Sequence, residues 1–159
     1  MIRPHILLGL WVSHLAGSAM GLALSSFLVA PDARVGFDPM APAAAGQILQ
    51  TLAEACFDGF CRPLPVAART GMAFLEALSK VRENESDDQI LSRAKEAARK
   101  AYDGDGFNSP GEKGYCPYLR RSFSDFTSLW QAAENCFQRL SHELYSPMIA
   151  AIKVVNYDV

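Results

Sequence analysis

Four cysteines are the residues with the clearest potential for chemistry: Cys56, Cys61, Cys116 and Cys136. Their even number is typical of a disulfide framework in an oxidising compartment. In a reducing compartment the same side chains would act as small buried hydrophobes. Cys56 and Cys61, in the segment CFDGFC, could form half of a zinc site, but the other two lie twenty residues apart and supply no second pair. We therefore expect four disulfide-bonded cysteines and no metal site.

The pairing of these cysteines depends on a helix expected near the C-terminus. If that helix begins near Pro117 and is unbroken, about 28 Å of helix rise separates Cys116 from Cys136, far beyond the ~4.4–6.8 Å between the Cα atoms of a disulfide. Both would then have to pair with the two earlier cysteines, which would staple the body together. A helix break at one of the serines after Pro117 would instead allow a local pair.

The sequence contains no arrangement typical of an enzyme. Hydrolases with a serine or cysteine nucleophile need a base beside it. Cys136 and His142 are six residues apart, which places them on different sides of a helix. Phosphate-binding glycine loops, dinucleotide fingerprints, metalloprotease motifs and paired carboxylates are missing as well. We expect a non-catalytic protein without a cofactor.

An uncharged N-terminal segment decides how the rest of the chain is interpreted. Asp, Glu, Lys and Arg are absent from His5 to Ala30. About 26 residues that each rise ~1.5 Å could cross a hydrocarbon core of ~30 Å. We therefore predict a transmembrane anchor over residues 1–31. The alternative is a signal peptide cleaved after Gly21 or Ala23, although such peptides usually have shorter apolar regions.

Small and polar residues gather on one side of the expected anchor. At about 100° per residue, this side contains His14, Gly17, Ser18, Gly21 and Ser25. Small residues at intervals of four let helix backbones approach closely in lipid, so we predict that these five residues form a helix-packing interface. For His14, a hydrogen bond to a neighbouring helix is the simpler interpretation, and contact with a haem or quinone is the alternative.

The remainder of the chain has mainly helical periodicity. We predict an extended linker over residues 32–45, which are rich in Pro, Ala and Gly, a helical domain over residues 46–146 and a C-terminal tail over residues 147–159. Ser86 and Gln89 have the pattern of a capping box that opens a helix ending at Gly104. The strongest apolar seam indicates a core helix and contains Phe123, Phe126, Trp130, Ala133, Phe137, Leu140 and Leu144.

The fold class that follows is all-α, with one N-terminal transmembrane helix and a small disulfide-stapled bundle of about four helices. The 15 basic and 17 acidic residues are scattered along the chain. The sequence therefore has no basic patch that would predict binding to nucleic acid. The few charges that flank the anchor favour export of the body to an oxidising side of the membrane.

These features lead us to expect a single-pass accessory subunit of an energy-converting membrane complex, either a respiratory or ATP synthase complex of the mitochondrial inner membrane or a thylakoid assembly. Its body would lie in the intermembrane space, with the thylakoid lumen or bacterial periplasm as alternatives. Its partners would be lipid and other subunits, reached through the transmembrane helix and the helical body. The alternative function is a secreted or periplasmic helical binding protein, of the inhibitor or immunity type, released by signal cleavage.

Overall fold

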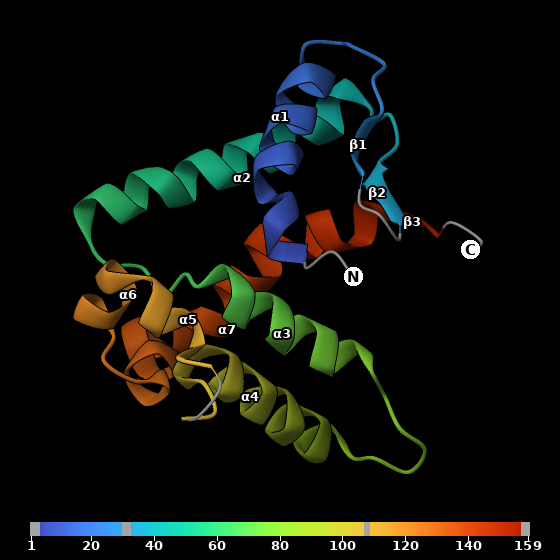
Figure 1. Ribbon diagram of the computed structural model, residues 1–159. Coiled ribbons are helices and arrows are strands. Elements are labelled where there is room, and N and C mark those ends of the chain that lie inside the picture. The colour runs from blue at the N-terminus through green and yellow to red at the C-terminus, as the bar shows by residue number, and fades with distance from the viewer. Residues whose placement is uncertain (1–3, 30–32, 107–108, 157–159) are drawn as a thin grey trace. The chain divides into compact units, whose positions relative to one another are not determined.

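A computed structural model describes residues 4–29, 33–106 and 109–156 of the 159-residue chain (Figure 1). These residues form one 3₁₀ helix, seven α-helices and three β-strands. The chain divides into two compact units. Unit 1 contains the residues up to Cys61 and those from Ser146 onward, and unit 2 is the continuous segment Arg62–Tyr145.

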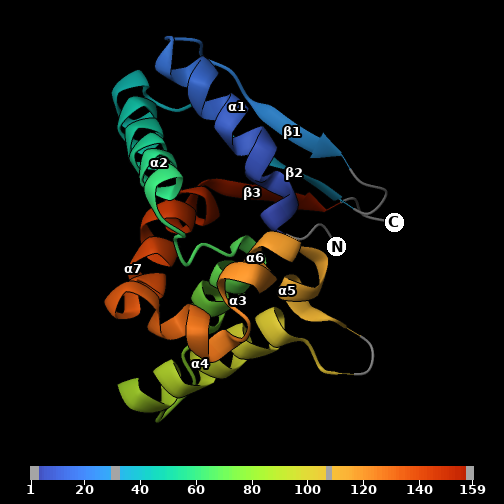
Figure 2. The same ribbon diagram turned by 90° about the vertical axis from the view of Figure 1, so that its left-hand side faces the viewer.

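Unit 1 combines helices with a small antiparallel sheet. Its elements are the 3₁₀ helix η1 (Pro4–Leu7), α1 (Leu8–Ala19), β1 (Ser26–Val29), β2 (Ala33–Phe37), α2 (Pro42–Cys61), the last turns of α7 (Phe126–Ala151) and β3 (Ile152–Asn156). The central strand is β2: Phe37 pairs with Ser26 of β1 and with Ile152 of β3 (Figure 2). A strand from the C-terminal part of the chain thus completes a sheet that begins near the N-terminus.

The uncharged N-terminal segment is not one long helix, because α1 ends in a Schellman motif. The backbone N–H of Leu22 donates to Gly17 O at 3.1 Å, and that of Gly21 donates to Ser18 O at 2.9 Å. Gly21 has a φ of +86°, a left-handed conformation that glycine adopts without the penalty of a Cβ atom. The chain then leaves the helix and enters β1.

This early helix end corrects the prediction of a membrane anchor over residues 1–31. Among the described residues, no helix has both the length and the apolar content that crossing a bilayer requires. The predicted single-pass membrane location is contradicted by the same finding. The all-α fold class is also wrong, because part of the apolar segment forms β1 and residues 33–37 and 152–156 form the two other strands. Residues 1–3 and 30–31 of the predicted anchor lie outside the described residues.

Aromatic side chains at the centre of unit 1 join α1 to β2. Trp11 and Phe37 are fully buried, and their ring centroids lie 4.8 Å apart. The imidazole of His14 is also buried and lies 5.5 Å from the Phe37 ring. Burying a phenylalanine side chain contributes about 1.5–3 kcal/mol. Because a one-residue slip would turn Phe37 to the other face of the sheet, this contact helps to fix the register of β2.

Unit 2 contains helices and loops among its described residues. Its elements are α3 (Ala68–Ser79), α4 (Asp87–Asp103), α5 (Gly111–Tyr115), α6 (Pro117–Ser122) and the larger part of α7. Helices α3 and α4 lie side by side in both views (Figures 1 and 2). The predicted capping box of Ser86 and Gln89 opens α4, and Gly104 follows its end, so both predictions are confirmed.

Phe74 of α3 packs against α7 in the core of unit 2. Its ring centroid lies 5.6 Å from that of Trp130 and 5.9 Å from that of Phe137. The predicted apolar seam is confirmed as a buried surface, because all of its residues except the alanine are buried. Gly71 lets α3 and α7 approach closely because it has no side chain. A Cβ atom at this position would lie only 2.6 Å from the ring of Tyr145.

The predicted disulfides are absent, because all four cysteines are free. Cys56 and Cys61 are exposed on α2, which continues as a helix through the segment CFDGFC. Five residues of α-helix rise about 7.5 Å, which exceeds the Cα separation of a disulfide. Cys116 is half-buried before α6, and Cys136 is buried in α7. A break separates α6 from α7, yet these two thiols are free as well, so the disulfide-stapled bundle is wrong.

We expect the Gly21→Ala variant to lower the free energy of unfolding by about 1–2 kcal/mol, because alanine carries a backbone penalty of that order in a left-handed conformation. A Cβ atom at Gly21 would meet no atom within 4 Å, so backbone strain alone sets the cost. Gly46→Ala is the matched control. A Cβ there also meets nothing within 4 Å, and alanine favours a helix interior by about 0.5–1 kcal/mol. Denaturant unfolding measures both variants, and equal effects in the two would contradict the role of Gly21.

Candidate functional site

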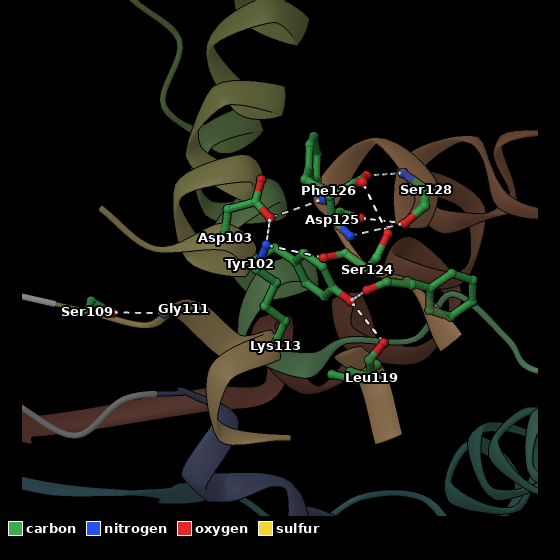
Figure 3. A network of polar contacts seen from close by, with 11 residues as sticks. Tyr102, Asp103, Ser109, Gly111, Lys113, Leu119, Ser124, Asp125, Phe126 and Ser128 are labelled. Atoms are coloured by element: carbon green, nitrogen blue, oxygen red, sulfur yellow. Dashed lines mark hydrogen bonds and ion pairs between the residues drawn. The ribbon is translucent and has the colours of Figure 1, made fainter. Parts of the chain in front are cut away.

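Polar side chains of unit 2 form a dense network where α4, α5 and α7 meet (Figure 3). Asp103 lies at the end of α4, and its Oδ1 accepts a hydrogen bond from Phe126 N at 3.1 Å and pairs with Lys113 Nζ at 2.8 Å. Lys113 Nζ also donates to Ser124 O at 3.3 Å. Both partners of the ion pair are only about a quarter exposed, so solvent ions screen it less than a surface pair. One carboxylate thus connects the end of α4 to α5 and to the start of α7.

The buried side chain of Tyr102 also forms hydrogen bonds in this network. Its side chain is fully buried, and its hydroxyl donates to Phe123 O at 2.6 Å, with Leu119 O as a longer contact at 3.3 Å. Burial raises the pKa of the Tyr102 phenol well above its ordinary value, and the negative charge of Asp103 adds to the effect. The phenol therefore stays protonated and serves as a hydrogen-bond donor.

A reciprocal cap begins α7. The backbone N–H of Ser128 donates to Asp125 Oδ1 at 2.8 Å, and that of Asp125 donates to Ser128 Oγ at 3.2 Å. The hydrogen bond from the Ser128 N–H holds the pKa of Asp125 below its ordinary value. These bonds satisfy backbone donors that the first turn of a helix leaves unpaired.

Glu112 of α5 caps the start of α3, although the two are far apart in the sequence. Its carboxylate accepts hydrogen bonds from Arg69 N at 3.1 Å, from Thr70 N at 2.7 Å and from Thr70 Oγ1 at 2.7 Å. The residue that precedes α3, Ala67, has no side-chain oxygen for this purpose. A negative charge is also favoured at a helix N-terminus by the helix dipole. Glu112 therefore fixes α5 against the start of α3.

The chemistry that these networks perform is the capping of helix ends. Each carboxylate named in them accepts hydrogen bonds from backbone N–H groups. Across the described residues, no group of His, Cys, Asp and Glu side chains is arranged to hold a metal ion. Cys136 is buried, and the guanidinium of Arg139 donates to its Sγ at 3.0 Å. His142 is exposed on α7, and its ring lies edge-on to Phe74 at 6.2 Å.

An exposed apolar surface on unit 1 is a second candidate. Along its 20 residues α2 has a single buried one, Ala45. Near the end of the helix, Phe57 is 69% exposed and Phe60 is 81% exposed, and their ring centroids lie 6.4 Å apart. The flanking Cys56 and Cys61 are exposed too. We name these four residues the α2 tip. Large apolar side chains that gather on a surface are typical of protein-interaction sites.

The five residues predicted to form a packing interface do not share one helix. Those on α1 are His14, Gly17 and Ser18, whereas Gly21 and Ser25 follow the helix. A Cβ atom at Gly17 would collide with the side chain of Leu24, so this glycine lets the chain's own loop pack on α1. His14 and Ser18 are buried. Contact between these residues and another protein stays a prediction.

Sequence reasoning missed the residues of the helix-capping network. Asp125 and Ser128 have the spacing of a capping box, so a local signal for this pair was present. Asp103 and Glu112 cap helices that begin far away in the sequence. No local pattern identifies such partners.

The geometry defines a mostly helical protein of two compact units, one of which contains a small antiparallel sheet. Residues 1–79 match the family model of the RecC C-terminal domain. The match covers η1, α1, β1, β2 and α2 of unit 1 and α3 of unit 2. No curated protein matches the chain.

This similarity corrects the predicted function. RecC is a family of subunits of a DNA-repair nuclease and helicase complex. The finding contradicts the predicted role in a respiratory, ATP synthase or thylakoid membrane complex. It also contradicts the predicted partners, which were lipid and membrane subunits without nucleic acid. The exclusion of nucleic acid had rested on the charge count and the scattered charges alone.

We expect Glu112→Gln to lower the free energy of unfolding by about 1–3 kcal/mol. An amide group keeps the size of the carboxylate, but its nitrogen cannot accept a hydrogen bond from the backbone at the start of α3. Glu76→Gln is the control, because the Glu76 side chain is 63% exposed and pairs only at the surface with Lys80. Loss of such a pair costs less than about 1 kcal/mol. Urea denaturation of both variants tests this, and equally small losses would show that the cap at α3 is unimportant.

We also expect stability to depend on the protonation of His14. Burial lowers the pKa of His14 below its ordinary value of 6.5, and the backbone of Asp38 acts more weakly in the opposite direction. The unfolded chain therefore binds this proton more readily than the folded one. The stability contribution is complete above about pH 6.5 and is lost as the pH falls below that value towards the folded-state pKa.

The measurement is the free energy of unfolding at intervals from pH 7.5 to pH 5. This one group can contribute a slope of at most about 1.4 kcal/mol per pH unit. In the His14→Gln variant the slope should decrease, because glutamine does not titrate. An identical pH dependence in the variant and the parent protein would refute the assignment to His14.

Proposed function

We propose that this chain is a protein-interaction module of a DNA-processing complex of the RecBCD type and contributes binding surface instead of catalytic groups. The observation that carries the proposal is the match of residues 1–79 to the RecC C-terminal domain. RecC is a subunit of such a complex. A chain with this similarity is therefore expected to act together with other subunits.

The surface of α2 supports a role in assembly. The α2 tip exposes two neighbouring phenylalanine rings, and this helix lies inside the matched region. Aromatic side chains supply much of the binding energy at protein interfaces because they bury a large area at a low entropic cost. We assign the α2 tip to contact with another subunit of the complex.

The polar networks support a non-catalytic role. Asp103, Glu112 and Asp125 are the carboxylates of the capping network, and each accepts a hydrogen bond from a backbone N–H at a helix start. If these carboxylates exchanged their hydrogen bonds for contacts with a substrate, the helix ends that they cap would lose their hydrogen-bond partners. A catalytic acid or base instead needs a lone pair or proton directed at the substrate.

The experiment that tests the proposal is co-expression of the chain with the other subunits of the RecBCD-type complex of its own organism. We expect stable co-elution in size-exclusion chromatography, and no cleavage or unwinding of DNA by the isolated chain. A chain that elutes alone at micromolar concentrations would refute the role in assembly. Nuclease activity of the isolated chain that survives stringent purification would refute the non-catalytic role.

The α2 tip can be tested separately by changing both phenylalanines to serine. Phe57→Ser with Phe60→Ser should raise the dissociation constant of the complex at least tenfold, because loss of an aromatic hot spot costs about 2 kcal/mol or more. Val81→Ser is the control, since Val81 is 69% exposed, like Phe57, but lies outside residues 1–79. Titration calorimetry measures the affinity, and circular dichroism checks the fold. An unchanged affinity would exclude the α2 tip and leave assembly through another surface.

A further inference from the structure

Three polar atoms on α1 are buried and have no hydrogen-bond partner within the described part of the chain. They are Trp11 Nε1, His14 Nε2 and Ser18 Oγ. None of the three residues is more than 1% exposed. Spacings of three and four residues place them in a row along one side of the helix. Buried polar atoms almost always have a partner, and an ordered water supplies it where the protein does not.

The hydrogen-bonding capacities of these atoms suit a water molecule. An indole N–H only donates, and a serine hydroxyl both donates and accepts. His14 Nδ1 lies 3.0 Å from Ser26 Oγ. If Nδ1 donates to Ser26, Nε2 is an unused acceptor. If Ser26 donates to Nδ1, the neutral imidazole carries its proton on Nε2, which is then an unused donor. A buried water typically makes about three hydrogen bonds and can serve both kinds of group.

His14 and Ser18 are well placed to share one water. Residues four apart on a helix have Cβ atoms about 5–6 Å from each other. Side chains on a helix lean towards its N-terminus, which favours a position of the Ser18 hydroxyl on the side of the turn that contains His14. Two polar atoms that face each other beyond direct hydrogen-bond distance are typically bridged by water.

The backbone of Asp38 is a further polar group close to the imidazole. A hydrogen bond between the imidazole and the Asp38 backbone acts to raise the pKa of His14, while Nε2 has no partner with ordinary hydrogen-bond geometry among the described residues. Asp38 directly follows β2, and Ser26 begins β1, where it pairs with Phe37. The His14 ring therefore lies beside the end of the sheet at which β1 begins and β2 ends.

We propose that unit 1 binds one internal water on the buried side of α1, held by His14 Nε2 and Ser18 Oγ and within reach of Trp11 Nε1. The water extends the hydrogen bond between His14 and Ser26 into a chain of polar contacts along the helix. It fixes the orientation of the imidazole against Phe37, because both ring nitrogens then have a partner.

Water-selective NOE spectroscopy on the isotope-labelled full chain tests the proposal. We expect NOEs from a long-lived water to the Trp11 indole N–H and to the carbon-bound Hε1 of His14, with the sign of a rigidly held molecule. The indole of Trp130 is the internal control, because its Nε1 is not among the buried unpartnered atoms. Absence of these NOEs at both Trp11 and His14 would overturn the proposal.

The matched variants are Ser18→Ala and Ser13→Ala. Ser13 lies on the same helix, but it is exposed and donates to Gly9 O at 3.0 Å. Ser18→Ala should reduce the water NOE at His14 severalfold, and Ser13→Ala should leave it unchanged. Equal intensities in the two variants would exclude Ser18 as a ligand of the water.

A crystal structure of the parent protein at about 1.5 Å resolution provides a test that does not depend on how the variants fold. Density within about 2.6–3.2 Å of both His14 Nε2 and Ser18 Oγ would support the water site. Direct hydrogen bonds from both atoms to other protein atoms would refute it.

Discussion

The left-handed turn at Gly21 is the constraint on which unit 1 depends. Its backbone conformation stops α1 and lets the chain enter β1 after a few residues. Helical continuation of this apolar segment would remove β1 from the sheet, and with it the serine that bonds His14. The contact between Trp11 and Phe37 then brings α1 onto the central strand. One glycine therefore determines that an apolar run becomes a helix and a strand.

Unit 2 depends on a different kind of interaction, in which carboxylates cap helices that are distant in the sequence. Glu112 binds the start of α3, and Asp103 binds the start of α7. Such bonds serve two purposes, because they satisfy backbone donors and also join elements that local sequence does not bring together. The aromatic core around Phe74 buries apolar surface. The carboxylates fix the positions of the helix ends relative to one another.

Local patterns in the sequence predicted local features correctly. The capping box of Ser86 and Gln89 follows from spacing alone. So does the burial of the seam residues Phe126, Trp130, Phe137, Leu140 and Leu144 on α7, whereas Phe123 lies before that helix. The anchor prediction was wrong because it rested on the hydropathy of the segment and on the spacing of its small residues. Gly21 fits the spacing of a helix-packing face, but a glycine at this position can equally end a helix, and here it does. The strand β3 was missed because its identity depends on β2, more than a hundred residues earlier. Of the candidate site, the local Asp125–Ser128 cap was predictable in principle, whereas the long-range caps and the α2 tip were not.

The pairing of β3 with β2 has a consequence for the order in which the protein folds. Residues 62–145 form unit 2 as one uninterrupted segment, so they can fold as soon as they leave the ribosome. Unit 1 must wait for the residues after Ser146, because until then one edge of β2 has no neighbour. At a synthesis rate of about 5–20 residues per second, the roughly 115 residues between β2 and β3 represent a delay of about 6 to 23 seconds. During that interval the nascent chain carries an open strand edge, which makes it a target for chaperones or for premature pairing with another chain.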